Sequence, residues 1–222
     1  MRIVKNSVNG SAFVGIFGCV TENLGLMPMT LKREEVKKIE KDLEIDVIQT
    51  NIGNSSLIGV LCAGNKKGFI VSDIIEAKEL KLLEQQGIRM LVVSGHNAIA
   101  NLLAVNDFGG VASKTLNKAT VKKIESFLKL ELTHSNIDGI EIVGSSIVAT
   151  NKGFLIHPKV SETKFKEISK ALKVKGNVGT ANYGDPFVRN SILANSNSAI
   201  VGEMTSGQEL LRIDESLGGE GQ

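Results

Sequence analysis

Tryptophan is absent from this sequence, and eight phenylalanines and one tyrosine bring the aromatic content to only 4%. A platform that stacks the bases of single-stranded nucleic acid needs several aromatic side chains, so the composition argues against such a platform. Long apolar runs are also missing, and none reaches the roughly 18 residues of a membrane-spanning helix. Met1–Asn6 has no apolar stretch of the kind that directs secretion. We therefore expect a cytoplasmic protein without a membrane anchor.

Cysteine and histidine are too few and too scattered for a recognisable metal centre. The two cysteines, Cys19 and Cys62, occur without CxxC spacing, and the three histidines form neither HxH nor HExxH. Each cysteine lies inside an apolar run. Four interpretations are open for such a residue: a disulfide partner, a metal ligand, a nucleophile or a small buried side chain. We favour the buried role, because intracellular chains seldom keep disulfides. No metal and no other cofactor is expected.

Phosphate-binding motifs and a strong charge imbalance are missing as well. The glycine-containing run from Gly59 to Gly64 matches neither GxGxxG nor a Walker loop. Basic residues number 26 and acidic residues 24, which leaves a formal net charge of +2. A chain this close to neutral is not built to hold nucleic acid by charge alone. The main signal that remains is the internal repetition of the chain.

The sequence repeats itself five times with a period of about 44 residues. Each copy contains an apolar run with small residues, a turn at Asn or Thr, and a short helix. The turn residues are spaced by 44, 41, 45 and 44 positions: Thr21, Asn65, Asn106, Asn151 and Asn195. The apolar runs before these turns predict strands at 13–20, 57–64, 98–105, 143–150 and 187–194.

An amphipathic helix is predicted after each turn, because apolar positions recur at i, i+3 and i+7. The triplets are Val36/Ile39/Leu43, Leu80/Leu83/Gly87, Val121/Ile124/Leu128, Phe165/Ile168/Leu172 and Leu210/Ile213/Leu217. The first member lies 15 residues beyond the turn residue in every copy except the fourth, where the spacing is 14. That difference predicts a turn one residue tighter at Asn151–Gly153. A further strand is expected after the first four helices, at 45–50, 88–93, 130–134 and 174–180.

The fifth copy lacks this last strand, whereas the start of the chain has a strand that belongs to no copy. The residues after Leu217 are expected to form a frayed tail, while Arg2–Lys5 reads as an isolated strand. We infer that residues 1–6 complete the fifth repeat and close a ring of ββαβ units with pseudo-fivefold symmetry. One such unit cannot bury its apolar face alone. The alternative is an open array, but it would need polar caps at both ends, and neither end has one.

The predicted fold is therefore an α+β ring formed by a single domain over residues 1–222. Its repeats cover approximately 11–54, 55–97, 98–142, 143–186 and 187–217, and strand 1–6 is added to the last. Six positions before the turns stand the small residues Gly15, Gly59, Ala100 and Ser145, with Gly144 as the alternative to Ser145. Small residues would let the strands approach the axis. Arg189 takes this position in the fifth copy, either as a side chain in the axial channel or as an ordinary surface arginine.

Several segments carry a resemblance to a known family: Gln49–Gly59, Asn151–Pro158, Gly179–Asn182 and Thr205–Leu210. They occur in order and at matching spacing, and over essentially its whole length the chain resembles the translation initiation factor 6 family in its archaeal branch. The resemblance implies the pentein fold, an α-β propeller of five repeats that is closed by the N-terminal strand. This fold agrees with the ring inferred from the repeats alone.

The resemblance also implies a non-enzymatic role. The family binds the large (50S) ribosomal subunit on its intersubunit face, chiefly against ribosomal protein L14 and near the sarcin-ricin loop of the large ribosomal RNA. It blocks joining of the small subunit by steric exclusion and is linked to the maturation of large subunits. The implied protein is a monomer that needs no cofactor, and its near-neutral charge suits a contact dominated by protein.

Contact residues follow from the resemblance as candidates on one end of the disc. It places Val60, Asn101 and Ser146 there, each five positions before its turn residue, and Ile16 and Asn190 are the remaining equivalents. Asn101 is the strongest candidate because it interrupts an apolar run, where an unbonded buried amide would cost about 1–3 kcal/mol. Its alternative role is to bond backbone groups inside the ring.

Two other functions fit the same architecture. Pentein enzymes that modify guanidino groups use a cysteine nucleophile with a histidine and an acidic residue, so they need a low-pKa thiol beside a base. Their cysteine lies near the C-terminus, where this chain has Ser191, Asn195 and Ser196. The second alternative is a ring scaffold without a ribosomal partner. Co-sedimentation with large subunits separates the scaffold from the factor, and hydrolysis of arginine or agmatine would reveal the enzyme.

Overall fold

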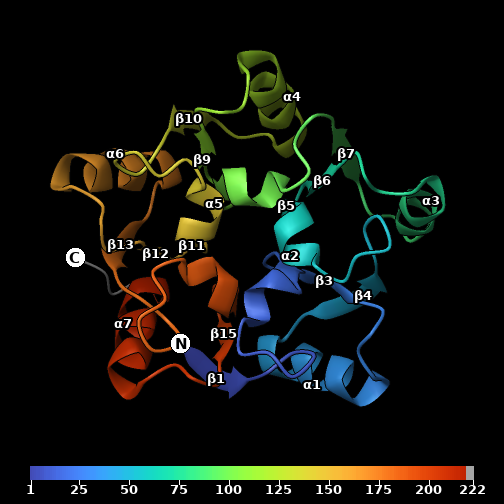
Figure 1. Cartoon of the computed structure of the whole chain (residues 1–222), viewed down its shortest axis with the longest axis horizontal. Helices are drawn as coiled ribbons and strands as arrows, with labels where there is room; N and C mark the ends of the chain where they lie inside the picture. Colours follow the sequence, from blue (N-terminus) through green and yellow to red (C-terminus); the bar gives the residue numbers. More distant parts are fainter. Residues whose placement is uncertain (219–222) are drawn as a thin grey trace.

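The structure, a computed structural model, describes residues 1–218 and contains five similar units arranged around a central axis (Figure 1). Within these residues each unit has one three-stranded sheet, and the long helices lie on the outside of the ring. Residues 219–222, most of the segment predicted to fray, lie outside the described residues. No helix within residues 1–218 is long and apolar enough to cross a membrane.

Every unit follows the same order: a short helical turn, an inner strand, a middle strand, a helix and an outer strand. Unit 1 contains η1 (Val14–Ile16), β2 (Cys19–Val20), β3 (Leu24–Pro28), α1 (Arg33–Leu43) and β4 (Asp46–Thr50). Unit 2 contains α2 (Ile58–Leu61), β5 (Cys62–Asn65), β6 (Gly68–Ser72), α3 (Ala77–Gln85) and β7 (Met90–Val93).

The remaining units repeat this order. Unit 3 contains η2 (Ile99–Leu102), β8 (Leu103–Val105), β9 (Gly110–Ser113), α4 (Lys118–Leu128) and β10 (Leu132–Ser135). Unit 4 contains α5 (Val143–Ser146), β11 (Ile147–Ala149), β12 (Gly153–Ile156), α6 (Glu162–Leu172) and β13 (Lys175–Val178). Unit 5 contains η3 (Val188–Ser191), β14 (Ile192–Ala194), β15 (Ser198–Gly202) and α7 (Gly207–Leu217), and its outer strand is β1 (Arg2–Asn6).

The N-terminal strand completes the fifth sheet, as the sequence predicts. In each sheet the middle strand pairs antiparallel with the inner strand and parallel with the outer strand. In unit 5 the outer position is taken by β1, which pairs in parallel with β15 from Arg2↔Ser198 to Asn6↔Gly202. The predicted α+β class and the ββαβ repeat are therefore confirmed.

The apolar runs before the turns are only half strand, which corrects the prediction of strands at 13–20 and its equivalents. The first half of each run forms one of the helical turns η1, α2, η2, α5 and η3, and the inner strand that follows has two to four residues. A short apolar run that is buried on every side has no periodicity to distinguish a strand from a helical turn. The sequence signal was therefore ambiguous at this point.

The turn of unit 4 is centred one residue earlier than predicted. The Thr150 backbone N–H donates to the carbonyl of Gly153 at 2.9 Å, as Asn106 does to Gly109 at 3.1 Å. Thr150 is thus the equivalent of Thr21, Asn65, Asn106 and Asn195. Phe165, the first apolar residue of that helix triplet, then lies 15 residues beyond the turn residue, as in the other units. No tighter turn is present.

The helices form where the triplets predict them, and each is wedged between the sheets of two neighbouring units. Ile39 and Leu43 of α1 pack with Met27 of their own sheet and with Leu193 and Ile200 of unit 5 in one buried cluster. Four equivalent clusters lie between the other pairs of units. Only Gly87 of the triplet residues falls outside its helix, because α3 ends at Gln85. The apolar core is therefore shared between units rather than enclosed within them.

Side chains of the turn residues tie four of the five units to the helix of the next; in unit 1, Thr21 bonds within its own turn instead. The Asn106 amide donates to the carbonyl of Leu172, the last residue of α6, at 2.9 Å. The Asn195 amide donates to Leu43, the last residue of α1, at 2.8 Å, and so joins unit 5 to unit 1. Asn65 and Thr150 make the same contact to Leu128 and Leu217. These bonds satisfy carbonyls that a helix end leaves without an intrahelical partner.

Close backbone packing at the axis requires glycine in several of the helical turns. A Cβ at Gly15 would lie 1.8 Å from the carbonyl oxygen of Arg189, and one at Gly59 would lie 1.9 Å from that of Gly15. A Cβ at Gly144 would lie 1.9 Å from the carbonyl oxygen of Ala100. The predicted role of the small residues is therefore correct, with Gly144 rather than Ser145 in unit 4.

Deletion of residues 1–6 tests the closure of the ring. The deletion removes the partner of β15 and leaves its edge open, so hydrogen-exchange protection should fall across residues 187–217. Lys5→Ala is the matched control, because it alters an exposed side chain of β1 and leaves the strand pairing in place. Unchanged protection of residues 187–217 in the deletion variant would refute closure by β1.

Substitution of Gly144 tests the packing at the axis. Because its Cβ would overlap a backbone oxygen, Gly144→Ala should lower the free energy of unfolding by about 2–3 kcal/mol or more in urea denaturation. The control is Gly207→Ala in the first turn of α7, where no atom lies within 4 Å of the added Cβ. That variant should be as stable as the parent or slightly more so. Equal stabilities of the two variants would contradict the packing described here.

Candidate interaction face

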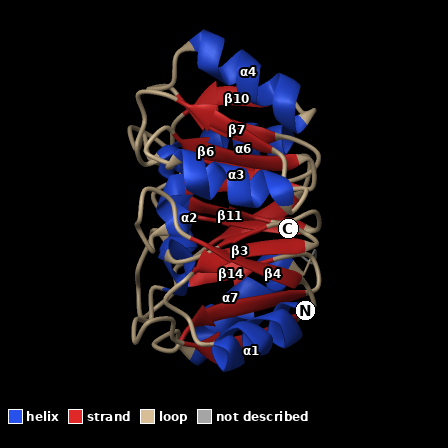
Figure 2. Cartoon of the chain, turned by 90° about the vertical axis from the view of Figure 1, so that its right-hand side faces the viewer, coloured by secondary structure: helices blue, strands red, loops and turns tan. Residues whose placement is uncertain are grey.

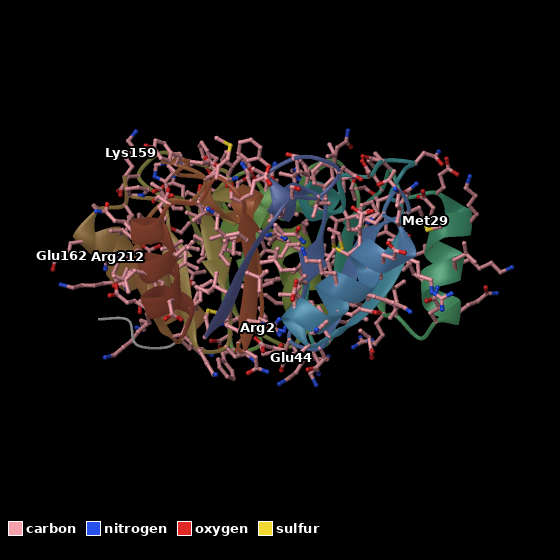
Figure 3. The ribbon with its side chains drawn as sticks, turned by 90° about the horizontal axis from the view of Figure 1, so that it is seen from below. Arg2, Met29, Glu44, Lys159, Glu162 and Arg212 are labelled. Carbon is pink, nitrogen blue, oxygen red and sulfur yellow. The ribbon has the colours of Figure 1, made fainter. Side chains whose placement is uncertain are left out.

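The ring has two flat faces of different character. One face, here called the helical-turn face, holds the five helical turns and the loops before them; the other, the strand-turn face, holds the turns at Thr21, Asn65, Asn106, Thr150 and Asn195. The strands run from one face to the other across the thickness of the disc (Figure 2). Seen from the edge in Figure 3, Lys159 lies toward the helical-turn face, and Arg2 and Glu44 lie toward the strand-turn face.

Exposed apolar side chains gather on the helical-turn face. Eight large apolar residues that are well exposed lie there, just before the helical turns, in the loops or at strand ends: Phe13, Met29, Leu57, Ile74, Ile142, Val178, Tyr183 and Met204. The others in residues 1–218 are Phe108 on the strand-turn face and Leu82, Val92 and Leu211 on the outer rim. Apolar side chains gathered on one face mark an interaction site more often than scattered ones do.

Buried carboxylates hold the loops of this face in fixed positions. Glu209 accepts hydrogen bonds from the backbone N–H groups of Tyr183 at 3.2 Å, Gly184 at 2.9 Å and Ser206 at 2.7 Å. Burial works to raise the pKa of the Glu209 carboxyl, but hydrogen bonds from Ser206, Thr180 and Gly184 outweigh it and keep the pKa below its usual value. Glu79 holds the loop at Gly53 and Asn54 in the same way. The face is therefore preorganised.

Four of the five predicted contact residues are partly exposed on the helical-turn face. Ile16, Val60, Asn101 and Asn190 lie in η1, α2, η2 and η3, and each is half-buried. Asn101 bonds through its backbone N–H to Ala98 at 3.0 Å, but within residues 1–218 its side-chain amide has no hydrogen-bond partner. The structure therefore gives no support to its alternative role of bonding backbone groups inside the ring.

Ser146 differs from the other four because its side chain is buried. Its hydroxyl donates to the carbonyl of Ile142 at 2.9 Å within α5. The cause is the register of unit 4: with Thr150 as the turn residue, the position five residues earlier is Ser145, which is buried as well. A buried side chain cannot reach a partner, so Ser146 is not retained as a contact residue.

Arg189 spans the axis at the helical-turn face. Of its two predicted positions, the axial channel is therefore correct, and the ordinary surface position is not. Its Nη1 donates to the carbonyl of Ala100 at 2.9 Å, and its Nη2 donates to that of Cys62 at 3.3 Å. These carbonyls belong to units 3 and 2, so one side chain of unit 5 joins three units. Behind it lies an axial chamber of about 50 Å³, lined by the inner strands.

The two cysteines are small buried side chains, and Cys19 lines this chamber. Cys19 and Cys62 are both fully or almost fully buried free thiols. Burial raises the pKa of the Cys62 thiol well above its ordinary value. The Cys62 thiol is therefore held in its protonated form, which is a poor nucleophile. The buried structural role favoured from the sequence agrees with this environment.

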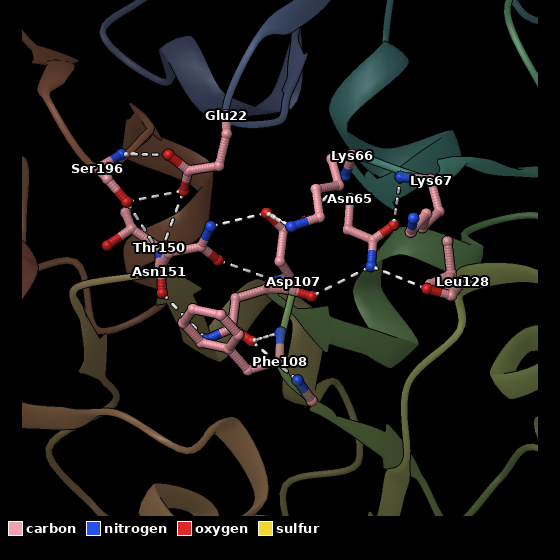
Figure 4. A network of polar contacts seen from close by, with 12 residues as sticks. Glu22, Asn65, Lys66, Lys67, Asp107, Phe108, Leu128, Thr150, Asn151 and Ser196 are labelled. Atoms are coloured by element: carbon pink, nitrogen blue, oxygen red, sulfur yellow. Dashed lines mark hydrogen bonds and ion pairs between the residues drawn. The ribbon is translucent and has the colours of Figure 1, made fainter.

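A polar network closes the strand-turn end of the axis (Figure 4). Glu22 accepts hydrogen bonds from the Ser196 hydroxyl at 2.9 Å and from the Asn151 backbone N–H at 3.2 Å. Asp107 accepts from the Asn151 side chain at 2.7 Å and pairs with the Lys66 ammonium at 3.5 Å. Both carboxylates are thus occupied by groups of the ring itself. Among the described residues no cluster of side chains is suited to hold a metal ion.

The apolar residues of the helical-turn face include positions that sequence reasoning missed. Phe13, Leu57 and Ile142 each stand eight positions before a turn residue, and Ala98 and Phe187 are their equivalents. The sequence contains this regularity, but counting from Asn151 hides it in unit 4, because the turn residue there is Thr150. Tyr183 had no such signal, because its loop is one residue longer than the loop of unit 2.

Comparison with known proteins gives full-length similarity to one family. A model described as the eIF-6 family matches residues 3–216. A protein of Methanococcus vannielii named translation initiation factor 6 is 37% identical over 97% of this chain and 98% of its own length. Proteins of the same name from Methanocaldococcus jannaschii and Pyrococcus horikoshii are 36% and 34% identical over at least 97% of both chains.

Proposed function

This chain belongs to the eIF-6 family, and from that membership and the character of the helical-turn face we propose that it acts in translation initiation by binding the large (50S) ribosomal subunit. The protein docks with the helical-turn face on the intersubunit side of that subunit. Joining of the small subunit is then blocked, because two bodies cannot occupy the same surface. The same contact serves in the maturation of large subunits.

The observation that supports this proposal is the uneven distribution of exposed apolar side chains between the two faces. Phe13, Leu57 and Ile142 occupy equivalent positions just before the helical turns. Met29 and Met204 lie in the loops that lead from a middle strand to the helix that follows it. The centre of a protein-protein interface is depleted in charged residues and enriched in aromatic residues and Met. The helical-turn face has the aromatic and Met residues of this composition, in Phe13, Tyr183, Met29 and Met204.

The partner expected at this face is mainly protein. We propose ribosomal protein L14 as the chief contact, with a smaller contribution near the sarcin-ricin loop of the large ribosomal RNA. A formal net charge of +2 gives little general attraction for phosphate. The protein acts as a cytoplasmic monomer in this proposal, and steric exclusion requires no catalysis.

Rigidity is the property that steric exclusion needs, and the ring supplies it. The helical turns pack backbone against backbone at the axis, and Arg189 braces three units at the centre of the docking face. A docked disc of this kind keeps its shape when another large body is pressed against it. No nucleotide-driven movement is part of this mechanism.

The alternative of a guanidino-modifying enzyme finds no reactive centre in these positions. Both thiols are buried, and the residues at the C-terminal positions have structural partners. Ser191 accepts a hydrogen bond from the Asn182 amide at 2.8 Å, Asn195 bonds the end of α1, and Ser196 bonds Glu22. These observations favour the binding role.

Subunit joining is the direct test of the proposed function. When the protein is added to separated subunits, a sucrose gradient should shift from 70S particles toward free 50S and 30S subunits, without added nucleotide. The protein should sediment with 50S and not with 30S subunits. Its binding should weaken only shallowly with salt, in contrast to a protein with 6–10 phosphate contacts, which loses about 10³–10⁵ in affinity between 50 and 200 mM. Unimpeded 70S formation would contradict the proposal.

Asn101 gives a residue-level test of the docking face. Replacement of this half-buried residue by arginine places a bulky charge at the centre of the helical-turn face, so Asn101→Arg should weaken 50S binding roughly tenfold or more. The melting temperature should stay close to that of the parent, since the amide has no internal partner in residues 1–218. The control is Asn197→Arg, which adds the same charge at an exposed position of the strand-turn face.

Two outcomes would contradict the assignment of Asn101. A stable Asn101→Arg variant that binds 50S subunits as the parent does would show that the docking face is wrong. A variant that unfolds at much lower temperature would show that the amide has a structural role instead. Weaker binding by the Asn197→Arg control would move the contact to the opposite face.

A further inference from the structure

Tyr183 combines high exposure with an unfavourable backbone conformation. Its side chain is 82% exposed, and its φ is +65°, in the left-handed region that side chains other than glycine seldom adopt. The residues on both sides, Asn182 and Gly184, also have positive φ. In the corresponding loop of unit 2, the positive-φ positions are held by Gly53 and Asn54, which tolerate this backbone well. A bulky aromatic ring is thus kept where the backbone itself favours Gly or Asn.

Buried groups hold the loop of Tyr183 from two sides. Glu209 accepts hydrogen bonds from the backbone N–H groups of Tyr183 and Gly184, at 3.2 and 2.9 Å. The Asn182 amide donates to the carbonyl of Ala12 at 2.7 Å and to the Ser191 hydroxyl at 2.8 Å. These contacts explain the conformation of the backbone, but none of them uses the tyrosine ring. The loop therefore fixes the backbone from which the ring projects, and no internal hydrogen bond accounts for the ring itself.

The same contacts place Tyr183 beside other apolar side chains at the junction of units 5 and 1. The Asn182–Ala12 hydrogen bond brings the loop next to Phe13, which is 43% exposed. The Asn182 backbone N–H also donates to the hydroxyl of Thr205 at 3.2 Å, next to the exposed Met204. We name Tyr183, Phe13 and Met204 the seam patch.

The charged side chains in the loops of the seam patch itself are acidic. Asp185 follows in the same loop, Glu203 precedes Met204, and Glu209 lies beneath the loop. A phosphate backbone would be repelled by these carboxylates, whereas an apolar pocket on a protein surface would accept the ring. Charge and composition therefore favour a protein over RNA as the partner of this patch.

We propose that Tyr183 is the anchor residue of the helical-turn face and inserts into an apolar pocket on a protein of the large subunit. This inference rests on the proposed function and names the chemistry of the partner at one end of the face. Tyrosine is among the residues that dominate binding energy at interfaces, because its ring is large and loses little conformational freedom. Because the loop backbone is held in place before binding, only the tyrosine side chain has to be ordered when the complex forms. Phe13 and Met204 would exclude water around it.

Substitutions at Tyr183 separate the role of the ring from the role of the backbone. Tyr183→Gly removes the ring and suits the positive φ, so it should weaken binding to purified 50S subunits roughly tenfold or more while the melting temperature stays equal or rises. Tyr183→Phe keeps the ring and should bind within about threefold of the parent. Leu211→Ala, a control at an exposed apolar position on the outer rim, should change neither property.

Tyr183→Arg distinguishes the two classes of partner. An apolar pocket would reject the charge, so binding should weaken and its dependence on salt should stay as in the parent. Tighter binding with a steeper salt dependence would identify RNA at this position and overturn the inference. Binding by Tyr183→Gly as tight as that of the parent would overturn it as well, while leaving the proposed function standing. Failure of the parent itself to bind 50S subunits would contradict both.

Discussion

The structure depends on hydrogen bonds that cross from the turn of one unit to the helix end of the next. Asn65, Asn106, Thr150 and Asn195 all make this contact, and Asn195 makes it between the last unit and the first. Each bond satisfies a helix carbonyl and a turn side chain, buried groups that would cost about 1–3 kcal/mol each if left unpaired. Thr21 is the exception, since it bonds within its own turn to Leu24. Neighbouring units therefore stabilise each other, and no unit satisfies its buried polar groups without its neighbours.

The two faces of the ring contribute differently to the structure. At the strand-turn end of the axis, Glu22 and Asp107 are occupied by internal partners, so that the polar groups there maintain the ring. At the helical-turn end the backbones are locked by close contact, and most of the large apolar side chains that are exposed in residues 1–218 lie on this face. A rigid body with one apolar face suits a protein that works by occupying a surface. The proposed role in blocking subunit association uses only these properties.

The sequence was sufficient for the ring but not for the details of the face. The 44-residue period, the helix triplets and the isolated first strand identify the units and their closure, because each rests on a repeated pattern. The helical turns could not be predicted, since a short buried run such as 57–64 has no periodicity. Turn assignment at Asn151 was wrong by one position, because Thr150 and Asn151 are both good turn residues; this error placed Ser146 on a surface from which it is absent. Tyr183 has no equivalent among the repeats, and only the folded loop shows its exposure.

The central claim is that the helical-turn face contacts a protein of the large subunit. Site-specific photo-crosslinking tests it most directly, with a benzophenone side chain placed at Leu57 or Ile142 on that face and at Phe108 on the strand-turn face. All three are exposed apolar positions, so the probes are matched in environment. The account predicts crosslinks from Leu57 and Ile142 to a ribosomal protein of 50S subunits and none from Phe108. Crosslinks from Phe108 alone, or crosslinks from Leu57 and Ile142 chiefly to ribosomal RNA, would contradict it.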